Sequence, residues 1–219
     1  LSLLDALPIS LTNVNTASQS TIQALLTGDG VSSATTMARS IYRYVHNSPG
    51  GVNNYHGILD LAVQCRNFGM ATADFARIYN DVTTSTNLYL RGRLNVNTAR
   101  AEVLSALFQG LNVDQQTADS AAQSLITYRE QNPTSLNSIA WMIDALGNNN
   151  QVITALRRGD YVTTRSYQFT ADIAAVGPFG RGYRRVKFIF DMSNGSPVIL
   201  YRQDLSRLGW ALGELAREI

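Results

Sequence analysis

The feature that most constrains the fold of this chain is an internal repeat. The phrase Asn-Val-Asn-Thr-Ala at residues 13–17 returns at residues 95–99, an offset of 82 residues. The match continues beyond the phrase, and after a two-residue insertion its offset is 84; the pairs are Ile22 and Leu104, Leu25 and Leu107, Gly28 and Gly110, Tyr44 and Tyr128, Pro49 and Pro133, and Asp60 and Asp144. Because a long-period repeat indicates a duplicated structural unit, we expect residues 11–64 and 93–146 to superpose as two related subdomains.

The apolar residues of each copy follow the period of helices. In the second copy, Val103, Leu104 and Leu107 lie on one helical face, and a second apolar face follows a break that contains glycine. After the matched prolines, the sequence predicts a short closing helix in each copy, and it predicts one more helix between the copies. These three segments are residues 58–63, 139–146 and 71–79. Residues 81–87 have the polar composition of a connecting loop.

A structural role is predicted for the repeated phrases. Thr98 or Asn97 is placed to act as the N-cap of the helix that follows, and Thr16 or Asn15 would do the same in the first copy. An N-cap side chain accepts a hydrogen bond from an otherwise unpaired amide of the first turn. The predicted motif residues are Asn13, Asn15, Thr16, Asn95, Asn97 and Thr98.

The last third of the chain changes to the period of strands. Apolar and polar residues alternate over residues 166–176 and 186–191, and a third strand is expected over residues 198–202 after an Asn-Gly turn at Asn194 and Gly195. Leucines at helical spacing then predict an amphipathic helix from residue 205 to the end. The predicted class is therefore α+β: two repeated helical subdomains that are SAM-like or helix-hairpin-helix-like, a small antiparallel sheet and a C-terminal helix.

These patterns divide the chain into five segments. Residues 1–10 resemble one reading frame of a common sequencing adapter, translated as LSLHDALPIS, so we expect a non-native leader with the natural N-terminus upstream of it. The remaining segments are a first helical subdomain at 11–80, a linker at 81–92, a second helical subdomain at 93–160, and the sheet with its terminal helix at 161–219.

The second copy carries a family resemblance. Residues 92–99 (Gly-Arg-Leu-Asn-Val-Asn-Thr-Ala), followed by Glu102, Val103 and Leu104, resemble the second helical subdomain of the minor pseudopilin K proteins of the type II secretion system. Members of this family have an N-terminal hydrophobic helix, a small sheet and a helical domain of two SAM-like halves before the final strands. The resemblance extends from about Leu11 through Tyr201, and the order of the predicted elements agrees with it.

This resemblance implies a function without catalysis. It implies a structural subunit at the tip of the pseudopilus, in contact with the I and J minor pseudopilins, and it makes secreted proteins further candidate partners. It also implies a position on the periplasmic side of the bacterial inner membrane, with an anchoring helix upstream of the sequence read. Some members bind calcium near the sheet, but residues 166–204 contain no close cluster of Asp, Glu and Asn that would carry this over. No cofactor is therefore predicted from the residues, and calcium stays open through the family resemblance alone.

The main alternative is a helix-hairpin-helix protein that binds DNA, since such modules share the Asn-Val-Asn-Thr-Ala phrase. Their hairpin amides hold phosphates, but the corresponding loops here, residues 28–31 and 110–113, do not preserve the usual Gly-apolar-Gly form. Residues 1–156 contain 8 Arg and 10 acidic residues, which gives a formal net charge of −2. Residues 157–219 contain 10 basic and 6 acidic residues, which gives a formal net charge of +4. An acidic module is poorly suited to phosphate binding, so no nucleic-acid partner is predicted.

Three other candidate sites have a simpler structural interpretation. Cys65, with His56 or His46, is the only conceivable nucleophile and base, but a buried structural cysteine fits its helical context better. Trp141 and Trp210 are expected in the core. The basic cluster of the last third is interpreted as a solvated strand edge that discourages strand pairing; its residues are Arg181, Arg184, Arg185 and Lys187.

One face of the predicted sheet is expected to lack its cover. A pseudopilin sheet packs against the N-terminal helix, which would lie upstream of the chain, so the apolar face marked by Phe169, Ile173, Phe188 and Phe190 should be open. About 200–400 Å² of uncovered apolar surface corresponds to roughly 5–10 kcal/mol. Alternatively, the helix predicted from residue 205 folds back and covers this face with its leucines.

Overall fold

A computed structural model describes the chain over residues 11–46, 53–86, 92–177, 182–192 and 195–208. The chain divides into two compact units. The first, Ile9–Arg165, contains both copies of the repeat, and the second contains Ser166–Ile219. The predicted leader, residues 1–10, lies outside the described residues, as do Trp210 and the chain from residue 209 onward.

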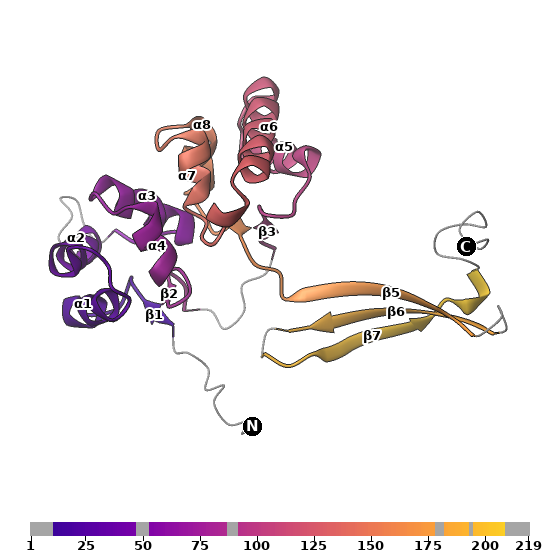
Figure 1. Cartoon of the computed structure of the whole chain (residues 1–219). Helices are drawn as coiled ribbons and strands as arrows, with labels where there is room; N and C mark the ends of the chain where they lie inside the picture. Colours follow the sequence, from indigo (N-terminus) through magenta and orange to yellow (C-terminus); the bar gives the residue numbers. More distant parts are fainter. Residues whose placement is uncertain (1–10, 47–52, 87–91, 178–181, 193–194, 209–219) are drawn as a thin grey trace. The chain divides into compact units, whose positions relative to one another are not determined.

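The first copy consists of four helices between two very short strands (Figure 1). Its elements are β1 Thr12–Asn13, α1 Gln19–Gly28, α2 Ala34–His46, α3 Ile58–Asn67, α4 Thr72–Ile78 and β2 Val82–Thr83. The helices predicted at residues 58–63 and 71–79 are therefore present as α3 and α4.

The second copy has the same order of elements (Figure 1). Its elements are β3 Leu94–Asn95, α5 Ala101–Gly110, α6 Gln115–Gln131, the 3-10 helix η1 Pro133–Ser135, α7 Trp141–Leu146, α8 Gln151–Leu156 and β4 Val162–Thr163. Helices α1 and α5 have 10 residues each and begin 82 positions apart. Helix α8, the counterpart of α4, is a helix that the sequence patterns did not reveal.

A two-residue parallel bridge joins the two ends of each copy. Strand β1 pairs with β2, and β3 pairs with β4, with Thr12 opposite Val82 and Leu94 opposite Val162. The bridges repeat in detail: the amide of Val14 donates to the carbonyl of Thr83, and that of Val96 donates to the carbonyl of Thr163. The prediction that residues 81–87 are only a loop was wrong, because Val82–Thr83 is a strand that closes the first copy.

The predicted helix caps were also wrong. The N-cap of α1 is Ser18, whose side chain accepts from the amide of Thr21, and that of α5 is Arg100, which makes no side-chain cap. The helices begin later than expected because the repeated phrase forms a turn of its own. In this turn the amides of Ala17 and Ala99 donate to the carbonyls of Asn13 and Asn95.

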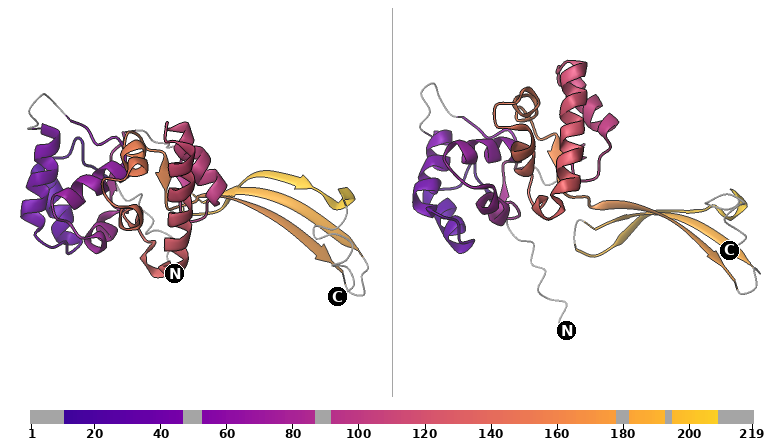
Figure 2. Two further views of the ribbon diagram at one scale, coloured as in Figure 1. Left: turned by 90° about the horizontal axis from the view of Figure 1, so that it is seen from above. Right: turned by 45° about the horizontal axis from the view of Figure 1, so that its top comes forward.

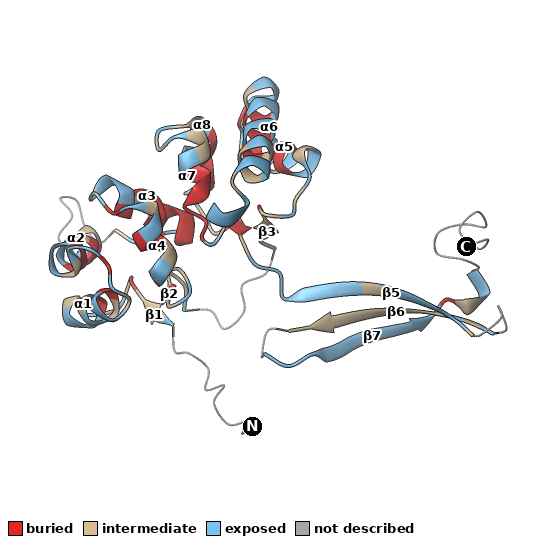
Figure 3. Ribbon diagram, in the orientation of Figure 1, coloured by how far each residue is buried: buried red, intermediate tan, exposed pale blue. Residues whose placement is uncertain are grey.

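The core of the first unit lies between the helices of both copies, where the buried segments in Figure 3 gather. Helices α1, α2, α5 and α6 each bury one apolar face in it, as expected for amphipathic helices, whereas most residues of α3 and α8 are buried. Trp141 is fully buried at the start of α7 and stacks on Tyr128 with 5.8 Å between ring centroids. The prediction that Trp141 is a core residue is confirmed.

The second unit contains a three-stranded antiparallel sheet in the order β5-β6-β7, whose twist is visible in Figure 2. The strands are β5 Gln168–Val176, β6 Tyr183–Asp191 and β7 Val198–Asp204, followed by the 3-10 helix η3 Ser206–Leu208. All three were predicted, β5 and β6 from the alternation of apolar and polar residues and β7 from its place after the Asn-Gly turn. Asn194 of the predicted turn lies outside the described residues, and Gly195 has φ 77°.

The basic cluster lies on the central strand, so its interpretation as a strand edge was wrong. Strand β6 is paired on both sides, and its charged side chains are matched by acids of the flanking strands. Arg185 forms a 2.6 Å ion pair with Asp172 on β5, and Arg184 lies 3.6 Å from Asp204 on β7. Arg181 lies outside the described residues.

The predicted apolar face exists. Phe169 is directly opposite Phe190, with ring centroids 5.6 Å apart, and Ile173 is opposite Val186 on the same face. Phe169 and Ile173 are exposed, at 43% and 54%, whereas Phe188 and Phe190 are half-buried. The alternative cover by the C-terminal helix falls on residues 209–219, outside the described residues.

Candidate functional site

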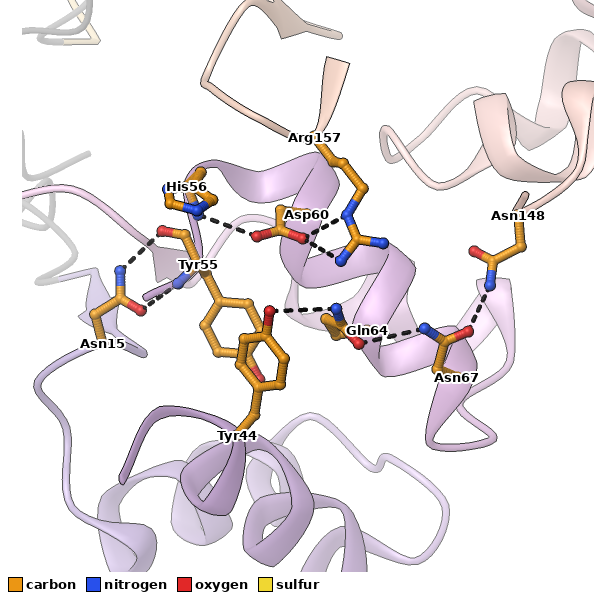
Figure 4. A network of polar contacts seen from close by, with 9 residues as sticks. All are labelled: Asn15, Tyr44, Tyr55, His56, Asp60, Gln64, Asn67, Asn148 and Arg157. Atoms are coloured by element: carbon orange, nitrogen blue, oxygen red, sulfur yellow. Dashed lines mark hydrogen bonds and ion pairs between the residues drawn. The ribbon is translucent and has the colours of Figure 1, made fainter. Parts of the chain in front are cut away.

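In the first copy, the side chain of Asn15 fastens two separate segments to the repeated phrase. Its Oδ1 accepts from the amide of Tyr55 at 2.8 Å, and its Nδ2 donates to the carbonyls of Tyr55 at 3.0 Å and Thr84 at 2.9 Å. Figure 4 shows the two bonds to Tyr55. The carboxamide therefore binds a peptide backbone through donor and acceptor together.

Asn97 does the same work in the second copy with a partly different set of partners. Its Nδ2 donates to the carbonyls of Leu136 at 3.1 Å and Thr164 at 3.4 Å. Its Oδ1 accepts from the indole Nε1 of Trp141 at 2.9 Å. We call Asn15 and Asn97, with the backbone and indole groups that they bind, the asparagine clamps.

The other motif residues shape the turn that presents each clamp. Oδ1 of Asn13 accepts from the amide of Asn15 at 3.0 Å, and Oδ1 of Asn95 accepts from the amide of Asn97 at 2.9 Å. Asparagine favours such local turns because its side chain reaches its own backbone two residues on. The hydroxyl of Thr16 lies 3.5 Å from the carbonyl of Asn13, and both Thr16 and Thr98 are exposed.

The matched aspartates pair with arginines of the opposite copy. Asp60, 1% exposed on α3, accepts from Nε and Nη2 of Arg157 at 2.9 Å each, and it also accepts from the amide of His56 at 3.2 Å (Figure 4). Asp144 on α7 pairs with Arg66 on α3 at 2.7 Å. These reciprocal ion pairs, together with the contact between Asn67 and Asn148, link the two copies.

One element of the clamps escaped the sequence patterns. The carbonyls of Thr84 and Thr164 belong to a second repeated phrase, Val-Thr-Thr, at residues 82–84 and 162–164. Its offset is 80 rather than 82 or 84, and three common residues are a weak signal by themselves. Its similar distance from the first phrase in the two copies, 69 residues from Asn13 to Val82 and 67 from Asn95 to Val162, would have revealed it.

Asn97 and two of its three partners, Leu136 and Trp141, lie inside a segment that matches a known family. Residues 94–155 match the family model of type II secretion system (T2SS), protein K. The resemblance that the sequence indicated is thereby confirmed. No curated protein matches the chain.

The protein K match begins at β3 and ends in α8, so it covers the helices of the second copy and its clamp residue Asn97. It supports a role of the chain in type II secretion. This family provides structural components of the secretion machinery, which agrees with the prediction made from the sequence. Among the described helices, none has the length and apolar character needed to cross a bilayer.

The two hairpins that would carry DNA binding use their amides internally. Gly30 and Asn112, which are 82 positions apart, both have left-handed backbones, with φ 66° and 63°. In both hairpins the next amide, that of Val31 or Val113, donates to a carbonyl of the preceding helix. This is the pattern of a helix C-terminal cap. The acidic Asp29 occupies the first hairpin, where burial and the nearby Asp81 raise its pKa.

The acidic residues of the sheet are paired with neighbouring side chains rather than gathered. Asp172 binds Arg185, which lowers the pKa of this carboxyl, Asp191 accepts from Gln168, and Asp204 lies near Arg184. Across the part of the chain that the structure describes, there is no group of three or more His, Cys, Asp or Glu side chains placed to share a metal ion.

Cys65 lies in α3 with 0% exposure, and burial raises the pKa of its thiol far above the ordinary value. The thiolate is the reactive form of cysteine, so this environment suppresses nucleophilic chemistry. His46 is exposed and stacks on Tyr42, with ring centroids 4.0 Å apart.

We therefore expect Cys65 to resist a thiol reagent such as Ellman's reagent in the native protein and to react completely in denaturant. Because the thiol is reached only when the helical unit opens, its labelling rate should rise with urea in parallel with unfolding. Absorbance of the released thiolate measures both rates. Rapid labelling of the native chain would contradict a buried structural cysteine.

Proposed function

We propose that the chain is a non-enzymatic minor pseudopilin that acts at the tip of a type II secretion pseudopilus through contacts with other proteins. The observation that carries the proposal is the protein K match over residues 94–155. The proposal extends this match from the second copy to the whole chain. It involves no cofactor.

Two features of the chain support this extension. First, the order of elements, two helical copies followed by an antiparallel sheet, agrees with the order implied by the family resemblance. Second, the most polar motif of the helical unit is used to hold the fold together: Asn15 and Asn97 direct their amides to the protein's own backbone. These residues support a scaffold rather than a catalytic centre.

The proposed partners are the I and J minor pseudopilins and the pseudopilus, with secreted proteins as further candidates. The proposed location is the periplasmic side of the inner membrane, with anchorage through a helix of the full-length protein. The exposed apolar face of the sheet, which includes Phe169 and Ile173, suits such an assembly because large exposed apolar patches mark sites of contact.

Mixing the chain with the soluble domains of the I- and J-type proteins from the same organism tests this proposal. Analytical ultracentrifugation should detect a complex that contains all three proteins, and an unrelated periplasmic protein serves as the control. In cells, deletion of the gene should abolish type II secretion, and the full-length gene should restore it. Normal secretion without the gene, together with no complex in solution, would reject the proposal.

DNA binding provides a separate prediction. We expect only non-specific binding of duplex or single-stranded DNA, seen at low salt and lost at physiological ionic strength. The reason is that residues 1–156 have a formal net charge of −2. Of the two arginines nearest the second phrase, Arg93 already lies 3.5 Å from Asp160, and Arg100 is exposed. Fluorescence anisotropy measures the affinity. Micromolar or tighter binding at physiological salt that is lost on Arg93→Ala or Arg100→Ala would favour the helix-hairpin-helix alternative.

A further inference from the structure

A polar cavity of about 480 Å³ lies beside the first asparagine clamp. The function proposed above assigns no role to this cavity. Three segments of the first copy line it, and one residue comes from the second copy. The lining residues are Asn13, Asn15, Thr16, Asn54, Tyr55, His56, Thr84, Ser85, Thr86 and Asp160. We call this cavity the junction pocket.

Close packing between the copies creates the junction pocket. A Cβ added at Gly57 would lie 2.8 Å from the carbonyl oxygen of Gly159 and 3.0 Å from Cα of Asp160, so glycine is required there. At an offset of 84, the same position in the second copy is Trp141, whose indole binds Asn97. The absence of a side chain at Gly57 brings Asp160 beside the clamp of the first copy. Junctions of this kind are common places for ligand sites.

Several polar groups in the junction pocket have no protein partner. Among the residues that the structure describes, the carboxamide of Asn54, the imidazole of His56 and the hydroxyls of Thr84 and Thr86 form no hydrogen bond with the protein. Nδ2 of Asn13 is also unused, because only its Oδ1 binds the turn. The pocket therefore offers donors and acceptors together.

The charge of the junction pocket is close to balanced. Asp160 has a side chain 19% exposed and lies 3.5 Å from Arg93, which is too far for a strong hydrogen bond. Burial raises the pKa of its carboxyl more than Arg93 lowers it. A ligand that donates hydrogen bonds to this carboxylate would replace the water that it has lost, and an anionic ligand would be repelled by it. Because Arg93 already neutralises part of the charge of Asp160, a neutral hydrogen-bond donor suits the pocket.

We propose that the junction pocket binds a neutral ligand rich in hydroxyl groups, of the class of a short oligosaccharide. Sugar hydroxyls are both donors and acceptors, which matches the mixture presented by Asn54, His56 and the threonines. Every lining residue is of a polar type, and the ring of Tyr55 is 2% exposed, so no aliphatic side chain and no exposed tyrosine ring lines the pocket to receive the apolar side chains of a peptide. Its volume falls within the range of small-molecule sites.

Two neutral sugars, triacetylchitotriose and maltotriose, serve as probes, and the neutral peptide triserine serves as the comparison. In a ¹H–¹⁵N NMR titration of the full chain, we expect at least one sugar to shift the amides of Asn13, Asn54, His56 and Thr84. Asn54→Ala should weaken this binding about fivefold, since one hydrogen bond is lost. Asn149→Ala, an exposed asparagine in the loop between α7 and α8, is the matched control and should leave it unchanged.

Three results would overturn the proposal: no shift of these amides by either sugar at millimolar concentrations, equal binding by the Asn54→Ala variant, or a response to triserine as strong as that to the sugars. Because Asn54 is exposed, its substitution should not affect folding. The two pseudopilin partners are absent from this titration. If no sugar binds, the proposed role in secretion is therefore unaffected. If no complex forms with the I- and J-type proteins, the proposal that the junction pocket binds a sugar is unaffected.

Discussion

Replacing Asp60 with asparagine is expected to destabilise the helical unit by about 3 kcal/mol, the lower end of the cost of breaking a buried ion pair. Asp60 is almost fully buried, whereas the side chain of Arg157 is 27% exposed, so water can partly compensate the unpaired guanidinium. The amide of asparagine has the same shape but no charge, and its NH₂ group would face either the donors of Arg157 or the amide donor of His56.

The duplicated aspartate supplies the matched control. Asp144 pairs with Arg66 at 2.7 Å, but the two side chains are 24% and 42% exposed, so Asp144→Asn should cost at most about 1 kcal/mol. Urea unfolding followed by the fluorescence of Trp141, in a Trp210→Phe background, measures both free energies. The double variant Asp60→Leu/Arg157→Met should recover part of the loss, because an apolar pair leaves no uncompensated charge.

Equal costs for Asp60→Asn and Asp144→Asn would contradict this account of the junction between the copies. Both substitutions remove one carboxylate from a pair with an arginine, and the largest difference between them is burial; in addition, Asp60 accepts from the amide of His56 and Asp144 from the hydroxyl of Thr72. Failure of the double variant to recover would instead indicate that Asp60 acts through its bond with the amide of His56.

The repeat made much of the helical unit predictable. Helical periodicity and matched glycines, prolines and aspartates located α1 to α3 and α5 to α7, because these signals are local in sequence. Helix α8 was missed since its six residues, Gln151–Leu156, span too few turns to establish a period. Strands β5 and β6 were predictable for the same local reason, a clear alternation of apolar and polar residues, and β7 was predictable from the Asn-Gly turn before it.

The partners of the clamps were not predictable from local patterns. Asn15 and Thr84 are 69 residues apart, and Asn97 and Thr164 are 67 apart, so no window of sequence contains both ends of either bond. The phrase itself suggested a helix cap because asparagine and threonine are common there. The order of the sheet was missed in a similar way: whether β6 is central or at an edge depends on pairing, which strand periodicity does not encode.

Substituting Asn97 with alanine is expected to destabilise the helical unit by about 3 kcal/mol, a value near the upper end of the cost of leaving buried polar groups unpaired. The change removes three hydrogen bonds, to Leu136, Thr164 and Trp141. Trp141 is 0% exposed, so its indole N–H would lose its partner with no water to replace it. Asn15→Ala should have a similar effect in the first copy, where Tyr55 and Thr84 are released.

Thr98→Ala is the control, because Thr98 belongs to the same phrase but is exposed, and its substitution should change the free energy of unfolding by less than about 0.5 kcal/mol. If the phrase acted as a helix cap, Thr98→Ala or Asn97→Ala would instead cost about 1 kcal/mol, the ordinary value of a cap. The same urea unfolding experiment distinguishes the two. A loss of only about 1 kcal/mol for Asn97→Ala would mean that the carbonyls and the indole find other partners, and the clamp would then be a minor contributor to a unit held mainly by its apolar core.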